Sequence, residues 1–173
     1  MDITISHIEG QFKLSFPPLS GPAPRVLILG SMPGEESLKQ VQYYGHPRNY
    51  FWPVMFSLLG KPFSPKYEDK VCLIQEQPVA LWDVLAGCIR KGSLDADIKN
   101  AELNNFEPFF AANPQLRAIC FNGKTAYRLF VKSVKVPAGV VLLPMPSTSP
   151  AYQQITAAER LAEWSKMLQY LDN

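Results

Sequence analysis

The sequence predicts a three-layer α/β/α fold with a central, mostly parallel sheet of four strands. Four short apolar runs alternate with stretches of helical periodicity, which is typical of a parallel sheet covered by helices on both faces. Two of these runs lead into turns rich in Gly, Pro and Ser, at residues 30–34 and 144–150. Because the carboxyl ends of parallel strands meet at one edge, we expect both turns at the edge where open α/β folds bind ligands.

Residues 1–24 precede the first core strand. Two stretches in this segment, 2–8 and 11–16, have extended character. The following PPLSGPAP is rich in proline, which disfavours both helix and strand pairing. We therefore expect an arm that wraps the surface of a single domain spanning residues 1–173.

The first half of the core begins with a strand at 25–29, the apolar run that enters the first turn. Residues 49–59 carry apolar side chains at helical spacing, and Gly60 provides a stop. A second helix is predicted at 64–77, followed by a second strand within the apolar run 78–85.

The second half begins with a predicted loop at 88–94 and a predicted helix at 95–112, with Asp95 as its cap. The remaining elements follow the same two patterns, with strands at 117–121 and 140–143 and helices at 124–131 and 156–171.

Composition narrows the class of protein. A chain of 173 residues with 47% hydrophobic and 18% charged residues is an ordinary globular domain. A net charge of +2 permits a nucleic-acid partner without requiring one. We expect no membrane partner and a cytoplasmic location, with association to the nucleoid if the source is bacterial, since neither a spanning segment nor a signal-peptide pattern is present. Cys72, Cys88 and Cys120 form no CxxC pair, so we expect free thiols and no metal or other cofactor.

The first turn, GSMPG at 30–34, matches neither a dinucleotide-binding fingerprint nor a phosphate-binding loop. Taken alone it fits a tight strand exit as well as a ligand site.

An aromatic and polar cluster follows within ten residues, consisting of Tyr43, Tyr44, His46, Arg48, Asn49, Phe51 and Trp52. Aromatic faces stack on nucleic-acid bases, arginine reaches phosphates, and an Asn amide both donates and accepts hydrogen bonds. Phe51 and Trp52 equally fit the buried face of the next helix, whereas Tyr44, His46 and Asn49 come before that helix begins.

The second turn contains small, hydroxylated and rigid residues, Ser147, Thr148, Ser149 and Pro150, after Met145 and Pro146. Such a loop either holds a phosphate through its hydroxyl and amide groups or simply reverses the chain.

In combination, GSMPG, YYGHPRNYFW and PMPSTSP resemble the motifs of the uracil-DNA glycosylase superfamily, most closely its hypoxanthine (deoxyinosine) DNA glycosylase branch. Mismatch-specific uracil-DNA glycosylases have a similar arrangement, GINPG followed by FAHPANRFW. The segments SFPPL, LWDVL, GSLDADI, FNGKTA and PSTSPA extend the resemblance over nearly the whole chain.

The resemblance implies a DNA glycosylase of base excision repair, which flips a deaminated base out of double-stranded or single-stranded DNA and hydrolyses its N-glycosidic bond. It implies that the base is bound by Gly30, Ser31, Met32, Pro33, Tyr44 and Asp83, with Tyr44 stacking on it. It implies DNA contacts by Arg48, Ser147, Thr148, Ser149 and Pro150. Tyr152 either intercalates in place of the flipped base or packs on the last helix.

Two departures from the superfamily pattern bear on the subtype. Met32 and Met145 stand where polar residues usually activate water and assist the departing base. In the hypoxanthine branch the polar role belongs to the Asn of HPRN, here Asn49. We therefore expect Asn49 to position the attacking water and His46 to assist the departing base or to anchor Asn49.

Further expectations complete this interpretation. Lys39, Arg48, Arg90, Lys91 and Lys124 either face DNA or form an ordinary solvated surface. No lysine lies in the motif segments, so a monofunctional enzyme without a Schiff-base intermediate is expected, acting as a monomer.

The alternatives are a mismatch-type enzyme acting on uracil or thymine and an inactive DNA-binding relative. A small-molecule hydrolase lacks support, because no GxSxG motif occurs.

Overall fold

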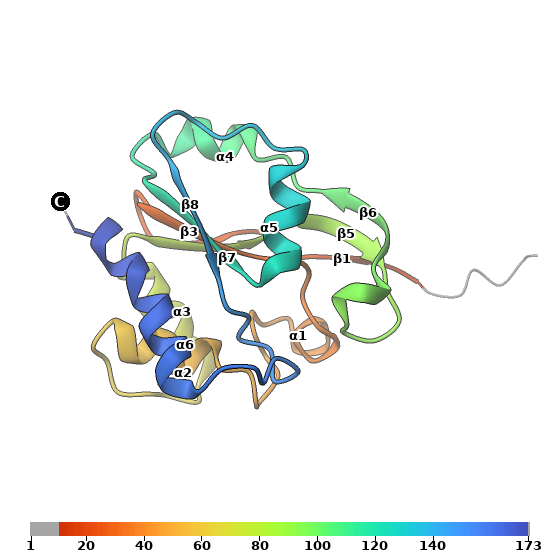
Figure 1. Cartoon of the computed structure of the whole chain (residues 1–173), viewed down its shortest axis with the longest axis horizontal. Coiled ribbons are helices and arrows are strands. Elements are labelled where there is room, and N and C mark those ends of the chain that lie inside the picture. The colour runs from red at the N-terminus through yellow and green to blue at the C-terminus, as the bar shows by residue number, and fades with distance from the viewer. Residues whose placement is uncertain (1–10, 173) are drawn as a thin grey trace, which may run out of the picture.

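Four parallel strands lie side by side at the centre of the fold (Figure 1). The structure is a computed structural model in which residues 11–172 are described. The short strand β2 (Leu19–Ser20) adds an antiparallel edge. The order is β2-β4-β3-β7-β8, with parallel members β3 (Val26–Gly30), β4 (Val79–Asp83), β7 (Ala118–Asn122) and β8 (Val141–Met145). The predicted parallel sheet of four strands is confirmed, and β2 adds a fifth strand that the sequence analysis did not predict.

Side chains of β3 alternate between the two faces of the sheet. Val26 and Ile28 belong to one apolar cluster and Leu27 and Leu29 to another, and none of the four has exposed surface. The first cluster includes residues of α2 (Phe51–Leu58), α3 (Tyr67–Gln75) and α6 (Ala157–Trp164), and the second includes residues of α4 (Glu107–Ala112) and α5 (Lys124–Val131). Helices therefore cover both faces, which confirms the three-layer α/β/α architecture.

Two shorter helices lie next to these elements. The helix α1 (Glu35–Gln40) follows the first turn, and the 3-10 helix η2 (Ser165–Tyr170) continues α6. Thr156 and Glu159 form a capping box at the start of α6, which supports the predicted helix at 156–171. No helix within the described part of the chain is long and apolar enough to cross a bilayer.

A second, antiparallel sheet lies beside the first, at the right in Figure 1. Its order is β1-β5-β6, with β1 (Phe12–Leu14), β5 (Leu85–Ile89) and β6 (Lys99–Leu103). The predicted loop at 88–94 is therefore wrong at Cys88 and Ile89, which pair with β1.

The predicted helix at 95–112 is also wrong over most of its length. A single 3-10 turn, η1 (Asp95–Asp97), is followed by β6, and α4 begins only at Glu107. Every residue of β6 is exposed, so no burial pattern marks it as a strand. Pairing with β5 decides its conformation, because strand formation depends on neighbouring strands more than on local preference.

The N-terminal arm supplies an edge strand to each sheet. β1 pairs with β5, and β2 pairs with β4. The expectation that proline keeps 17–24 out of strand pairing is wrong at Leu19 and Ser20, which lie between the prolines. The arm is further held by the Trp82 indole, which donates to the Phe16 carbonyl at 3.1 Å. The predicted extended stretch at 2–8 lies outside the described residues.

Candidate active site

The carboxyl ends of the four parallel strands bring distant residues to one edge. Gly30 pairs with Asp83 across β3 and β4, and Asn122 pairs with Met145 across β7 and β8. The Gly123 amide donates to the Met145 carbonyl at 3.1 Å, which holds the turn after β7 against the end of β8. The two predicted turns therefore open at the same edge, as expected.

A buried carboxyl and a buried hydroxyl converge at Gly30. A Cβ atom on Gly30 would lie 2.7 Å from Asp83 Oδ1 and 3.2 Å from the Tyr44 hydroxyl oxygen. Asp83 is only 4% exposed. Among the described residues, its Oδ2 atom and the Tyr44 hydroxyl have no hydrogen-bond partner. Since buried polar atoms are nearly always paired in folded proteins, these two mark a place where a ligand would complete the hydrogen bonding.

Burial also controls ionisation at this position. It raises the pKa of Asp83 to about 7, and the Arg90 guanidinium lowers this pKa while the Asp95 carboxyl raises it further. Burial raises the pKa of the phenols of Tyr43 and Tyr44 above the ordinary range, and the nearby Asp83 charge adds to both increases. Asp83 therefore exchanges its proton near neutral pH, while the two phenols stay protonated.

The ring of Tyr44 is held in a fixed position beside this carboxyl. It stacks on Phe51, with ring centroids 3.9 Å apart and planes inclined by 23°. Tyr44 has a φ of 52°, which is uncommon outside glycine. Its neighbours fix the turn, because the Gly45 amide donates to Ser37 Oγ at 2.9 Å and the Trp52 indole donates to the Tyr43 carbonyl at 2.8 Å. Phe51 occupies one face of the ring, so base stacking requires the other face.

His46 and Asn49 lie in a tight turn just before α2. The backbone amide of Asn49 donates to the His46 carbonyl at 3.0 Å, and the backbone amide of Arg48 donates to His46 Nδ1 at 3.1 Å. Because Nδ1 accepts, the neutral imidazole carries its hydrogen on Nε2. Asn49 Oδ1 accepts the Phe51 amide at 2.9 Å and keeps a second lone pair. Asn49 therefore binds the backbone amide of Phe51, the first residue of α2, and still offers polar atoms to a substrate.

Thr148 anchors the second turn, residues 144–150, which we call the late loop, to β7 and to the start of α2. Its amide donates to Asn122 Oδ1 and its hydroxyl accepts from Asn122 Nδ2, both at 2.9 Å. Its carbonyl accepts the Tyr50 amide at 3.0 Å. The residue has no exposed surface. The expectation that Thr148 touches DNA phosphate does not fit this burial, because its polar groups hold the loop in place.

Arg160 of α6 binds main-chain carbonyls in and just after the same loop. Its guanidinium donates to the Ser147 carbonyl at 3.2 Å and to the Tyr152 carbonyl at 2.9 Å. It also lies 4.1 Å from the ring centroid of Tyr50. The Trp164 indole adds a bond of 2.9 Å to the Pro146 carbonyl. The predicted DNA contacts of Ser147, Ser149, Pro150 and Tyr152 stay predictions, on a loop whose backbone is firmly held.

The two methionines that differ from the superfamily pattern, Met32 and Met145, both pack into apolar clusters. Met32 packs with Leu85 and Cys88, and Met145 belongs to the cluster that contains Ile28. Neither side chain offers a polar group to the strand-end edge, so the chemistry of the site depends on other residues.

Arg90 is buried and hydrogen-bonds to the first turn. Its side chain donates to the Gly92 carbonyl at 3.0 Å and to the Pro33 carbonyl, and its Nη1 lies 3.9 Å from Asp95 Oδ1. That Asp95 oxygen also accepts the Ser31 hydroxyl at 2.6 Å. The expectation that Arg90 faces DNA is wrong, because the residue is 2% exposed. The other cations proposed to face DNA, Lys39, Arg48, Lys91 and Lys124, are exposed.

Sequence reasoning missed Asn122 and Arg160. Asn122 belongs to the FNGKTA segment, where an Asn-Gly pair suggests only a turn. Arg160 lies on an amphipathic helix and has no local feature that separates it from a surface residue. Asn122 bonds to Thr148, 26 residues away, and Arg160 bonds to Ser147 and Tyr152, 13 and 8 residues away.

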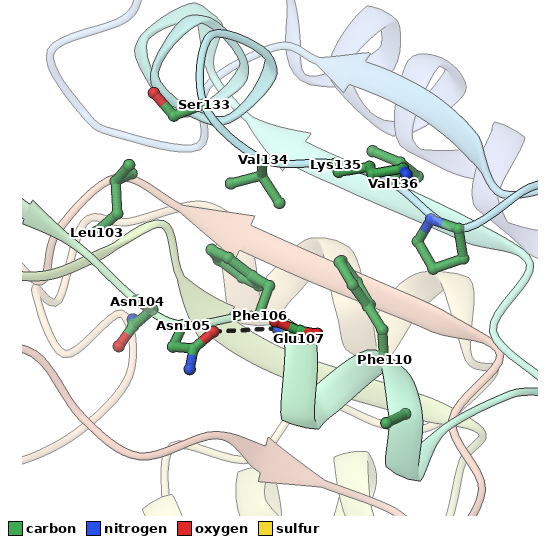
Figure 2. A pocket seen from close by; sticks show the side chains of 12 residues that line it. Leu103, Asn104, Asn105, Phe106, Glu107, Phe110, Ser133, Val134, Lys135 and Val136 are labelled. Atoms are coloured by element: carbon green, nitrogen blue, oxygen red, sulfur yellow. Dashed lines mark hydrogen bonds between the residues drawn. The ribbon is translucent and has the colours of Figure 1, made fainter.

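A cavity of about 640 Å³ lies away from this edge. Figure 2 shows the rings of Phe106, just before α4, and of Phe110, within α4, facing Val134 across the cavity. None of the predicted site residues lines it. Within residues 11–172, no group of three His, Cys, Asp or Glu side chains is placed to hold a metal ion.

Comparisons with known proteins place the chain in a family. The sequence model of the uracil DNA glycosylase superfamily matches residues 17–172. A Methanosarcina acetivorans protein named hypoxanthine DNA glycosylase is 33% identical over 161 residues, spanning 91% of this chain and 99% of its own length. A Methanosarcina barkeri protein of the same name is 38% identical over 113 residues, 65% of this chain and 72% of that protein.

A solved structure agrees with the sequence relatives. It is the solution NMR structure of a candidate uracil DNA glycosylase from Methanosarcina acetivorans, with a TM-score of 0.77 and 32% identity. It covers 94% of this chain and 100% of its own. These matches agree with the resemblance of the motifs at 30–34, 43–52 and 144–150. The chain belongs to the uracil DNA glycosylase superfamily.

Proposed function

We propose that this chain is a DNA glycosylase that excises hypoxanthine from DNA containing deoxyinosine. The observation that carries the proposal is its near-full-length similarity to a protein named hypoxanthine DNA glycosylase. In the reaction, the bond between sugar C1′ and purine N9 breaks and the oxygen of a water molecule bonds to C1′. The water proton passes to the base or to solvent, and an abasic site remains. The enzyme is expected to act as a cytoplasmic monomer.

The site geometry supports a division of roles. The flipped purine stacks on the face of Tyr44 opposite Phe51, since Phe51 covers the other face. The free lone pair of Asn49 Oδ1 orients the attacking water. The Nε2–H group of the neutral His46 imidazole donates a hydrogen bond to the departing purine and keeps its proton. A neutral amide is a poor base, so Asn49 acts by orientation and by stabilising the positive charge that grows on the sugar.

Replacing Asn49 tests the substrate and its catalytic role together. Single-turnover cleavage is measured on duplexes carrying one deoxyinosine, deoxyuridine or deoxyxanthosine, with alkali revealing abasic sites. We expect wild type to cleave the deoxyinosine duplex and Asn49→Ala to be slower by about 100-fold or more, because the water loses its orienting oxygen. Asn49→Asp keeps an acceptor oxygen for the Phe51 amide and a second one for the water, so it should retain measurable activity.

Asn105→Ala is the matched control. Asn105 Oδ1 accepts the Glu107 amide at 3.4 Å, just as Asn49 Oδ1 accepts the Phe51 amide, so both variants lose a bond at a helix start. Each should lose about 1 kcal/mol of stability at most, and Asn105→Ala should keep the wild-type rate. If wild type binds DNA but cleaves none of the three duplexes, the chain is better explained as an inactive DNA-binding relative. Cleavage of only the deoxyuridine duplex would favour the mismatch-type enzyme.

The segments 30–34, 43–52 and 144–150 contain no lysine, which supports a monofunctional mechanism. Borohydride added during turnover is expected to trap no covalent adduct between enzyme and DNA. A trapped adduct would overturn the hydrolytic mechanism while leaving the assignment as a glycosylase.

A further inference from the structure

The connection between β5 and β6, residues 90–98, lies beside α1 and the first turn (Figure 1). Two charged side chains of this connection bond to the turn. Arg90 donates to the Pro33 carbonyl, and Asp95 Oδ1 accepts the Ser31 hydroxyl at 2.6 Å. The Arg90 Nη1 atom lies 3.9 Å from the same Asp95 oxygen, so an ion pair links the two contacts.

Two uncharged residues of the connection extend the contact toward α1. Ser93 Oγ accepts the backbone amide of Glu35 at 2.8 Å and would lie 3.3 Å from a Cβ atom on Gly34. Gly34 is the N-cap of α1 and has no side chain, so a serine 58 residues from Glu35 supplies an acceptor for the first amide of the helix. Ile98 packs against the apolar cluster that contains Met32. The connection therefore contacts the whole stretch from the first turn to the start of α1.

The main chain that leads into β5 also bonds to the turn. The Val84 amide donates to the Gly30 carbonyl at 2.8 Å, and the Leu85 amide donates to the Ser31 carbonyl at 3.1 Å. Residues 84–98 thus hold the turn by main-chain bonds at its beginning and by side chains along its length. Gly30 is also the point where the Asp83 carboxyl and the Tyr44 hydroxyl converge, so the position of the turn determines the shape of the candidate site.

We propose that the 90–98 connection holds the first turn in the geometry that cleavage requires, and that Asp95 is its positioning residue, acting through the Ser31 hydroxyl. This inference rests on the proposed function and assigns a task in it to a segment from the second sheet. Displacing an active-site group by about 1 Å costs on the order of 100-fold in rate. Arg90 and Ser93 remain when Asp95 is replaced, and they limit the displacement.

The contact affects the chemical step more than the attachment to DNA. Ser31 and Met32 are only 8% and 7% exposed, so the turn offers little surface to a DNA backbone. The exposed cations and the late loop offer that surface instead. Loss of the contact to Asp95 should therefore lower the cleavage rate and leave the affinity for DNA nearly unchanged.

Replacing Asp95 tests the inference, because its side chain is 41% exposed and is not part of the core. Single-turnover rates are measured on whichever of the three duplexes wild type cleaves fastest, and affinity for abasic DNA is measured by fluorescence anisotropy. We expect Asp95→Ala to cleave about tenfold more slowly and to bind within about twofold of wild type. Asp95→Asn keeps an acceptor oxygen for the Ser31 hydroxyl and should recover most of the rate.

A second substitution shows whether Asp95 acts through the hydroxyl. In a Ser31→Ala background, Asp95→Ala should slow cleavage by less than about twofold further, because the bond that it removes is already lost. Asp97→Ala is the matched control. It removes another exposed acid of η1, one that is not bonded to the turn, and should keep the wild-type rate.

Amide hydrogen exchange adds a measurement that needs no activity. In the free protein, peptides covering residues 31–38 should exchange about tenfold faster in Asp95→Ala than in wild type, because the turn opens more often. The same peptides should be unchanged in Asp97→Ala. Thermal melts establish that each variant is folded.

The wild-type rate in Asp95→Ala would overturn the inference while the proposed function stands. An equally large effect of Asp95→Ala in the Ser31→Ala background, or no recovery in Asp95→Asn, would also overturn it, because Asp95 would then act by another route. So would a loss of DNA affinity as large as the loss of rate. If wild type cleaves none of the duplexes, the proposed function fails, and the exchange measurement alone decides whether the connection holds the turn.

Discussion

Asp83 lowers the stability of the folded chain at neutral pH. Its pKa rises from 3.8 to about 7 on burial, so between these values the folded chain holds a proton that the unfolded chain has released. The stabilising contribution of this proton is complete below about pH 4 and is lost as the pH rises through 7. A carboxyl at the candidate site is thus maintained at a cost in stability, as is common at functional sites.

Asp83→Asn should remove this pH dependence. Between pH 5 and pH 8, wild type is expected to lose about 3 kcal/mol more free energy of unfolding than the variant. Urea unfolding at the two pH values measures the difference, with Asp97→Asn as a control that follows wild type. Parallel changes in wild type and Asp83→Asn would mean that Asp83 does not titrate in this range.

The local sequence points to some residues of the candidate site and not to others. Tyr44, Asp83 and Asn49 belong to the polar and aromatic positions singled out around strand ends and motif turns. Thr148 was expected to contact DNA because the family resemblance implies it, and the partner that buries it, Asn122, is 26 residues away. Arg90 has the chemistry of a surface cation, and its burial depends on a carbonyl 57 residues away at Pro33.

At the level of elements, α6 holds the late loop through one side chain. Arg160 bridges the carbonyls of Ser147 and Tyr152, 5 residues apart in the chain, through Nε and Nη2 of its guanidinium. Lysine offers a single ammonium group and stacks poorly on Tyr50, so it cannot reproduce this clamp.

Arg160→Lys is therefore expected to weaken binding to abasic DNA by about tenfold, because the loop must then be ordered on binding. It should also lower the free energy of unfolding by about 1–3 kcal/mol. Fluorescence anisotropy with labelled DNA measures the affinity. Arg128→Lys, at an exposed position of α5, preserves charge and serves as the control. Unchanged affinity in Arg160→Lys would show that the clamp is not needed for DNA binding.

The burial of each element explains whether it could be predicted from the sequence. The strands β3 and β7 were found because they are buried apolar runs, and α5 was found because one face is apolar. The strand β6 is exposed throughout and was taken for a helix. The strand β2 is two residues between prolines, and only its pairing with β4 identifies it.

On the scale of the whole molecule, the two sheets are joined closely. Only Val84 separates β4 from β5. The Asn104 side chain, just after β6, donates to the Asp83 carbonyl at 2.8 Å. Arg90, just after β5, reaches back to Pro33 beside β3. Opening either sheet would break these contacts to the other, and the single domain stays a prediction that unfolding can test.

The chain is therefore expected to unfold in one cooperative transition. Differential scanning calorimetry should give a calorimetric enthalpy equal to the van't Hoff enthalpy, and far-UV and near-UV circular dichroism should give the same midpoint. A separate early transition with loss of strand signal would instead mean that the antiparallel sheet melts independently.

The three tryptophans share one feature, an indole hydrogen bonded to a main-chain carbonyl. The acceptors belong to Phe16 in the arm, Tyr43 in the turn that carries the stacking ring, and Pro146 in the late loop. Indole emission responds to the loss of such a bond and to the entry of water. The protein thus contains an intrinsic fluorescent reporter for each of these segments. Movement of the late loop on DNA binding should change the emission of Trp164, without any attached dye.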